Sequence, residues 1–378
     1  MYIKNTCNHI NVISFDIPVP ANYGGAIDVY YKLKSFKRAG IKVHLHCFEY
    51  DRKHSNKLND ICETVNYYKR HISKANLFKH KPYIVASRAS EELIVNLLKN
   101  DYPILFEGLH TCYYLDDKRL YKRKKIVRTH NIEYDYYQNL AKVENNIFKK
   151  YYFFNEATKL KRYEKVFNYA DAIAVISKSD KLYFEKKFKH VVTISAFHAN
   201  ERVNIKEGIG NYALYHGSLS VGENNKDALF LVNKIFNDID IPLIIAGDKP
   251  SKELEQEVKK FKHIELRKNI STKKIYELIR NAQINILPTF QTTGIKIKLL
   301  CALYSGRHCI VNSHMVKNTG LENLCVIKDS SKAMKEEVKN LFTVPFDKQS
   351  KIMREKVLLN GIFSNNYNIE KLIKMLFA

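Results

Sequence analysis

The chain has 378 residues, of which 45% are hydrophobic and 27% charged, and its formal net charge is +24 at pH 7. This length exceeds what one hydrophobic core usually supports, so we expect two domains. The composition is that of globular proteins and excludes a disordered or fibrous chain. The positive charge favours an anionic partner such as nucleic acid, acidic lipid headgroups or phosphorylated small molecules.

Targeting and metal-binding patterns are absent from the sequence. No stretch approaches the roughly 18 apolar residues that a membrane span needs, and residues 1–6 lack the apolar segment of a signal peptide. We therefore expect a cytoplasmic protein. The seven cysteines are scattered and form no C-x-x-C pair, so we expect reduced core thiols, with no metal site and no cofactor.

Short apolar runs alternate with helical patterns in the first half of the chain. The first run, at 10–15, leads through a loop to Gly25 and into a helical stretch that ends at Gly40. Further strand-like runs lie at 42–48, 104–106, 125–129, 172–176 and 191–194. This alternation is typical of a doubly wound α/β domain, which we place at residues 1–198.

The second half repeats this alternation after a polar, glycine-containing segment at 199–211, which we interpret as a linker. Its strand-like runs lie at 213–216, 242–246, 264–266, 284–287 and 309–311. We expect a second Rossmann-like domain at 212–344. Residues 345–378 look helical, and we expect them to cross back to the first domain.

The segment 289–306 has the pattern of a phosphate-binding turn. A polar turn containing Gly294 leads into an apolar helix with Lys296 and Lys298 near its start. The first amides of a helix lack internal partners and the helix dipole favours an anion there, to which the two lysines add full charges. Taken alone, the pattern fits equally well an ordinary amphipathic helix with solvated lysines.

Two loops of the first domain follow predicted strands and are candidates for ligand contact. Gly24 and Gly25 allow the backbone to approach a ligand closely, although such a pair also forms plain turns. His130, Asn131 and Glu133 would lie near the carboxyl edge of the sheet, where ligands collect. A neutral histidine can donate to a sugar hydroxyl while a carboxylate holds its tautomer, and the alternative is a structural His beside a capping Asn.

Two loops of the second domain are further candidates for ligand contact. Gly217 and Ser218 follow the run at 213–216 in a small-residue loop whose amides can face phosphate, and the run at 242–246 ends at Gly247. Each signal is weak alone. Asp238 and Asp240 have the spacing of a metal pair but stand without other ligands, so we interpret them as a surface turn.

Together these motifs resemble the retaining glycosyltransferases of the GT-B fold, most closely the family 4 type and its bacterial relatives. The resemblance covers nearly the whole chain and implies two Rossmann-like, doubly wound domains facing a cleft. It implies that His130, Lys296 and Glu133 carry the chemistry. It also implies that the nucleotide sugar contacts Gly24, Gly25, Gly217, Ser218, Gly247, Thr292, Thr293, Gly294, Ile295, Lys298 and Cys301.

The sequence departs from this family at two places. Its E-x7-E pair is matched by Thr293 and Cys301, and cysteine can scarcely replace the glutamate that holds the ribose. The usual Arg and Lys of the first glycine loop are also missing, with Ser218 and 224–225 near those places. Lys296 and Lys298 would supply the positive charge instead.

The resemblance implies metal-independent transfer of a sugar, with retention, from a nucleotide diphosphate sugar to a glycan or lipid-linked acceptor. An acceptor on an anionic lipid would suit the net charge of +24 and a peripheral position at the inner membrane face, in polysaccharide biosynthesis. The main alternative is a catalytically degenerate protein that binds nucleotide sugar or glycan without turnover. Nucleic acid is not an expected partner, because no recognisable binding module is present.

Overall fold

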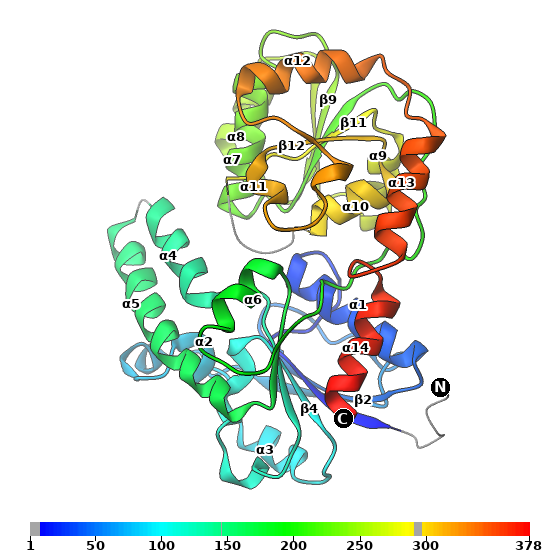
Figure 1. Cartoon of the computed structure of the whole chain (residues 1–378). Coiled ribbons are helices and arrows are strands. Elements are labelled where there is room, and N and C mark those ends of the chain that lie inside the picture. The colour runs from blue at the N-terminus through cyan, green and yellow to red at the C-terminus, as the bar shows by residue number, and fades with distance from the viewer. Residues whose placement is uncertain (1–7, 145, 291–296) are drawn as a thin grey trace. The chain divides into compact units, whose positions relative to one another are not determined.

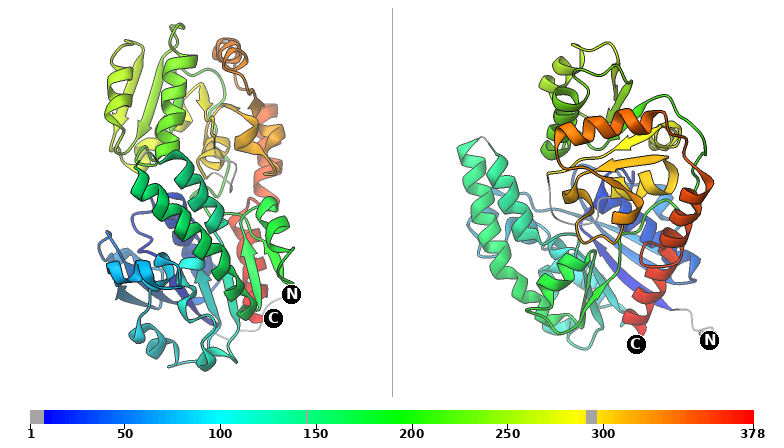
Figure 2. Two further views of the ribbon diagram at one scale, coloured as in Figure 1. Left: turned by 90° about the vertical axis from the view of Figure 1, so that its left-hand side faces the viewer. Right: turned by 45° about the horizontal axis from the view of Figure 1, so that its top comes forward.

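The computed structural model describes residues 8–144, 146–290 and 297–378. Contacts between Cα atoms divide the chain into two units (Figure 1). Unit 1 comprises Met1–His198 and Asn365–Ala378, and unit 2 comprises Ala199–Ser364. Each unit contains one parallel β-sheet with helices packed on it (Figure 2).

Unit 1 has a seven-stranded sheet in the order β3-β2-β1-β4-β5-β6-β7. Its strands are β1 (His9–Ser14), β2 (Lys42–Glu49), β3 (Thr64–Lys69), β4 (Ile104–Glu107), β5 (Lys125–Arg128), β6 (Ala172–Val175) and β7 (Val191–Thr193). All neighbouring strands are parallel. The strand order reverses at β1, which pairs with both β2 and β4, and ligands of such sheets bind at the carboxyl ends of the strands beside this reversal.

Helices cover both faces of this sheet, each with its own apolar core. On one face, Ile10 and Val12 of β1 pack with α1 and α14, while Ile13 faces the opposite core with α3 and α5. The helices of unit 1 are α1 (Gly24–Arg38), α2 (Tyr83–Ala86), α3 (Glu91–Leu97), α4 (Glu133–Val143), α5 (Ile147–Tyr163), α6 (Lys178–Phe184) and α14 (Asn365–Phe377). The last helix of the chain therefore belongs to unit 1.

Unit 2 has a six-stranded parallel sheet in the order β10-β9-β8-β11-β12-β13. Its strands are β8 (Ala213–His216), β9 (Leu243–Gly247), β10 (Ile264–Lys268), β11 (Ile284–Ile286), β12 (His308–Val311) and β13 (Val326–Ile327). Its helices are α7 (Gly222–Phe230), α8 (Lys252–Val258), α9 (Thr272–Asn281), α10 (Ile297–Ser305), α11 (Ser313–Val316), α12 (Ser331–Phe342) and α13 (Lys348–Leu359). Here the order reverses at β8, between β9 and β11.

The predicted fold class, two doubly wound α/β domains, is confirmed by these two sheets. The expected strands are present, and the structure adds the edge strands β3 and β13, which the sequence pattern did not reveal. Among the described residues, no helix combines the length and the apolar character that crossing a membrane requires.

Candidate functional site

A network of buried charges lies at the carboxyl edge of the unit 1 sheet. Glu107 ends β4 and Arg128 ends β5, and His130 follows two residues later. Asp28 and Lys32 stand one turn apart on α1, which follows β1. Four of these side chains are fully buried, and that of His130 is 10% exposed.

Lys32 joins the two carboxylates of the network. Its Nζ lies 2.9 Å from Oδ2 of Asp28 and 2.7 and 2.8 Å from the two carboxylate oxygens of Glu107. Arg128 adds an ion pair of 3.2 Å from Nη2 to Oδ1 of Asp28, and this oxygen also accepts from the amide of Phe197 at 2.7 Å. Buried charges are tolerated in proteins when they are paired and hydrogen-bonded in this way.

His130 is held between the same two carboxylates. Its Nε2 lies 3.0 Å from Oε2 of Glu107, and its Nδ1 lies 3.6 Å from Oδ2 of Asp28. Because a carboxylate only accepts, the Glu107 contact favours the tautomer with the proton on Nε2. The ring edge meets Phe15 at a centroid distance of 5.3 Å. The orientation of His130 is therefore set by Glu107 and Asp28 and not by Glu133.

The charges of the network decide the protonation of its acids. Burial opposes ionisation of Asp28, but Arg128 and Lys32 outweigh it and lower the pKa of Asp28. Burial likewise opposes ionisation of Glu107, whose pKa is lowered by Lys32 and by the hydrogen bond from His130. Asp28, Glu107 and His130 each offer a metal-ligand atom within 4.8 Å of one another. The Lys32 ammonium already occupies both carboxylates, so we assign no metal to them.

Glu133, the first residue of α4, faces a second histidine. Its Oε1 lies 3.8 Å from Nδ1 of His110, and both atoms are buried with no hydrogen-bond partner among the described residues. Burial raises the pKa of Glu133 to about 8. Burial and the nearby Arg88 lower the pKa of His110 well below its ordinary value. At neutral pH the pair is therefore an uncharged carboxylic acid beside a neutral imidazole.

Sequence reasoning missed Asp28, Lys32, Glu107 and His110. One signal for two of them was available. Glu107 ends β4 and His110 follows it, just as His130 follows β5, and these two strands are neighbours.

The predicted glycine loop begins α1. Gly24 is exposed, and a Cβ added to Gly25 would lie 2.7 Å from Cζ of Phe15. The Phe15 ring in turn contacts His110 and His130, at centroid distances of 5.4 and 5.3 Å. Gly25 thus allows Phe15 to pack beneath the two histidines. Ligand contact by Gly24 and Gly25 stays a prediction.

The two predicted glycines of unit 2 meet at the ends of neighbouring strands. A Cβ on Gly247 would lie 2.2 Å from the carbonyl oxygen of Gly217 and 2.6 Å from Cγ of Leu219. Only glycine therefore permits the loop after β8 to approach β9 so closely. Ser218 lies in this loop, and its carbonyl accepts from Nδ2 of Asn224 at 2.9 Å.

Lys298, in the first turn of α10, contacts the strand and the helix on either side of this loop, β8 and α7. Its Nζ lies 3.0 Å from Oδ1 of Asn224, 3.3 Å from the Tyr215 hydroxyl and 3.4 Å from Oδ2 of Asp227. Burial lowers the pKa of Lys298, and Asp227 opposes this shift. Burial and Lys298 together lower the pKa of neighbouring His216 to about 3. In the part of the chain that the structure describes, its buried Nε2 has no hydrogen-bond partner.

The remaining predicted donor residues divide into two groups. Cys301 is buried on α10, with its Sγ 3.1 Å from the Tyr276 hydroxyl, and burial raises the pKa of its thiol. Its environment is an apolar cluster with Leu278 and Ile279 of α9. The other predicted residues, Thr292, Thr293, Gly294, Ile295 and Lys296, lie outside the described residues.

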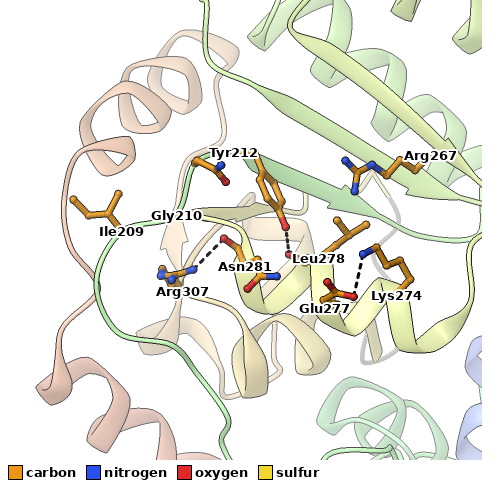
Figure 3. Close-up of a pocket in the computed structure, with 10 residues that line it drawn as sticks. Ile209, Gly210, Tyr212, Arg267, Lys274, Glu277, Leu278, Asn281 and Arg307 are labelled. Atoms are coloured by element: carbon orange, nitrogen blue, oxygen red, sulfur yellow. Dashed lines mark hydrogen bonds and ion pairs between the residues drawn. The ribbon is translucent and has the colours of Figure 1, made fainter.

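A pocket of about 680 Å³ lies beside α9 and contains none of the predicted site residues (Figure 3). Its charged side chains have other partners: Lys274 Nζ lies 3.0 Å from Oε2 of Glu277, and Arg267 pairs with Glu265. Arg307 donates to three carbonyls at the end of α9. We therefore assign this pocket no functional role.

Comparison with known proteins gives a family match and a curated relative. Residues 210–343 match the model of the family Glycosyl transferases group 1. A Klebsiella pneumoniae protein described as an uncharacterized 44.6 kDa protein in the cps region is 29% identical over 348 residues. The alignment covers 85% of this chain and 87% of the relative.

Solved structures share the fold over the whole chain. TarM has a TM-score of 0.68 at 11% identity, and each chain is covered completely. A mutant form of Staphylococcus aureus TarM, solved with UDP, gives 0.68 at 12% identity, covering 98% of this chain and 100% of the other. A trehalose-phosphate synthase from Burkholderia xenovorans gives 0.64 at 9% identity, covering 98% and 100%. At these identities the likeness establishes the fold.

Proposed function

We propose that this chain, which has the GT-B fold and matches group 1 glycosyl transferases over residues 210–343, transfers a sugar from a nucleotide diphosphate sugar to an acceptor hydroxyl. The family match carries the proposal, because it extends from the start of β8 to the end of α12 and so includes almost every strand and helix of unit 2. The finer assignment to family 4, and to transfer with retention, rests on the sequence resemblance.

In this proposal unit 2 binds the donor. Gly217, Ser218 and Gly247 lie at the carboxyl edge of the sheet, and the predicted signature that contains Lys296 leads into α10. Negative charge develops on the departing diphosphate, and lysine ammonium groups with helix amides stabilise such charge when water is excluded. Support comes from two structures of similar fold that were solved with UDP and with UDP-2-fluoro glucose.

Lys298 would act from a fixed position. Its contacts with Asn224, Tyr215 and Asp227 hold the ammonium in place, so little side-chain reorganisation is needed when charge develops nearby. Asp227 balances part of its charge, and we therefore assign the larger share of diphosphate stabilisation to Lys296. The step requires no metal ion in this scheme.

Unit 1 would orient the transferred sugar through His130. The hydrogen bond to Glu107 fixes the ring, and its other nitrogen faces Asp28 at a distance too long for a good hydrogen bond. A positioned donor sugar and acceptor hydroxyl supply much of the rate through orientation alone. The protonated Glu133 beside His110 is a second polar pair at this edge, and we propose it for acceptor contact.

The proposed acceptor is a glycan or a lipid-linked acceptor. The cps-region name of the Klebsiella pneumoniae relative supports a role in polysaccharide synthesis. The competing function is binding of nucleotide sugar or glycan without turnover, favoured by the buried Cys301 at the position of the family's second glutamate.

Thermal unfolding in the presence of UDP, GDP, ADP and their sugars tests donor binding. A ligand at about 100 times its dissociation constant adds roughly 2.7 kcal/mol to the free energy of unfolding. We expect one nucleotide class to raise the melting temperature and the others to leave it unchanged. Absence of any shift would contradict the proposal, while a shift without product in mass spectrometry would favour the binding protein.

A further inference from the structure

The outer surface of helix α5 is unusually apolar for an exposed helix. Its first two turns expose Ile147 (74%), Phe148 (83%), Tyr151 (75%) and Phe154 (43%). Asn146 begins this helix by accepting hydrogen bonds from the amides of Phe148 and Lys149, so the apolar residues lie in an ordered, capped turn.

Packing within unit 1 does not account for these side chains. α4 and α5 lie side by side and extend beyond the sheet of unit 1 (Figure 1, Figure 2). Their contact uses the inner side of α5, where Phe153 meets Tyr137 at 5.9 Å and Ala157 and Leu160 are buried. The outer apolar residues remain exposed.

The charge on the same helix has one sign. In residues 146–165 the two acidic side chains, Glu156 and Glu164, are buried. The exposed charged residues of this stretch are all basic: Lys149, Lys150, Lys161, Arg162 and Lys165. At 3.6 residues per turn, Ile147, Tyr151, Phe154, Lys161 and Arg162 of α5 fall on one stripe, which Phe148 and Lys150 flank. Lys165 follows the end of this helix at Tyr163. The stripe is apolar at the start of the helix and basic at its end.

We propose that this stripe, from Ile147 to Arg162 on the outer face of α5, docks unit 1 on an anionic lipid bilayer together with Lys165, which follows the helix. Aromatic and aliphatic side chains enter the boundary between headgroups and acyl chains, and the lysines beside them pair with anionic headgroups. Phe and Tyr beside Lys are the residues that such interfacial helices use. A protein partner of this surface would need acidic side chains around an apolar centre, whereas an anionic membrane supplies both features over any area. The inference stands independently of the proposed reaction, because it needs neither donor nor acceptor.

Flotation of the full chain with vesicles tests the docking surface. We use phosphatidylcholine vesicles with and without about 30% phosphatidylglycerol. The chain is expected to float with the anionic vesicles and to dissociate at about 1 M salt, where the lysine contribution is screened.

Phe148→Ser with Tyr151→Ser should weaken binding roughly tenfold or more through lost apolar contact. Lys150→Gln with Lys165→Gln should weaken it roughly fivefold per lysine at low salt.

Tyr121→Ser is the matched control. Tyr121 is also in unit 1, is 79% exposed and precedes a lysine, but lies outside the stripe, so binding should stay at the wild-type level. Far-ultraviolet circular dichroism shows whether each variant is folded, and the lysine pair gives a second test should the aromatic pair misfold. Failure of the wild type to float, or equal flotation of the aromatic variant, would overturn the proposal. So would a change of oligomeric state in that variant with unchanged vesicle binding, since the stripe would then be an interface between copies of the chain.

Discussion

Lys32 is the residue on which the buried charges of unit 1 depend. Its ammonium contacts both Asp28 and Glu107, which in turn hold His130. A buried ionic cluster rarely stabilises a fold more than well-packed apolar residues would. Its value here is therefore the fixed position of the histidine at the carboxyl edge of the sheet.

Replacing Glu107 with Gln tests this dependence. The substitution leaves Lys32 without its closest counter-charge in a buried site, and we expect the free energy of unfolding to fall by about 3 kcal/mol. Urea denaturation followed by circular dichroism measures the loss. Glu63→Gln is the control in the same unit, because its exposed pair with Lys42 at 3.2 Å should contribute less than about 1 kcal/mol. Equal losses in the two variants would contradict the assignment.

Glu133 makes stability depend on pH. Its pKa rises from an ordinary value of 4.5 to about 8 in the folded chain, so the folded state retains a proton that the unfolded state releases. As pH increases through this window, the folded state loses stability relative to the unfolded state, by at most roughly 1.4 kcal/mol per pH unit. Below about pH 4.5 and above about pH 8, the contribution of Glu133 to the free energy of unfolding no longer changes with pH.

Glu133→Gln should remove that slope, because glutamine stays uncharged at every pH. The free energy of unfolding of the variant minus that of the wild type is expected to grow between about pH 5 and about 8 and then level off. Denaturation series at several pH values give this difference. A difference that is constant across the window would show that Glu133 ionises normally in the fold.

At the scale of elements, the loops after neighbouring strands are shaped by close packing. Gly247 at the end of β9 touches the loop that follows β8, and Lys298 of α10 is tied to α7 through Asn224 and Asp227. The carboxyl edge of the unit 2 sheet therefore depends on contacts among the loop after β8, helix α7, the end of β9 and the start of α10. A small shift of one of these elements should therefore alter the geometry of the proposed donor site.

Gly247→Ala is the direct test of this packing. The added methyl would meet the Gly217 carbonyl oxygen at 2.2 Å, so we expect a loss of about 1–3 kcal/mol in the free energy of unfolding and weaker nucleotide binding. Gly222→Ala, at the start of α7, has nothing within 4 Å of the new Cβ and should be neutral or slightly stabilising. Denaturant melts and nucleotide titrations compare the two. If Gly247→Ala were as stable as Gly222→Ala, the close contact between Gly247 and the Gly217 carbonyl would be contradicted.

The elements that the sequence predicted are those with continuous apolar runs. β1, β4 and β9 are buried almost throughout, and this pattern is visible in the residues themselves. β3 was missed because an edge strand with mixed polar and exposed residues lacks that run. β13 was missed because it has only two residues.

The candidate site was predicted in part for a related reason. His130 and Glu133 follow a recognisable strand, so their place at the sheet edge follows from local pattern. The contact between Lys32 and Glu107 joins residues 75 positions apart and exists only because β4 pairs with β1, next to α1. Strand order is not readable from periodicity, and the carboxylate partner of His130 was therefore not predicted.

At the scale of the whole molecule, two doubly wound sheets of the GT-B fold carry an excess of positive charge. The formal net charge of +24 is suited to phosphorylated ligands and to anionic surfaces alike. Lys296 and Lys298, which we propose to stabilise the diphosphate of the donor, account for a small part of this charge. The basic residues of the α5 stripe, on the outer face of unit 1, account for another part.

The most direct measurement is release of nucleoside diphosphate from sugar nucleotides by the purified chain, followed by mass spectrometry with glycan and lipid-linked acceptors present. The account predicts release from one sugar nucleotide together with a glycosylated acceptor. It also predicts a rate roughly 10²-fold lower in His130→Gln, which misplaces the sugar, while thermal stabilisation by the donor is retained. No release from any sugar nucleotide, or an unchanged rate in His130→Gln, would contradict it.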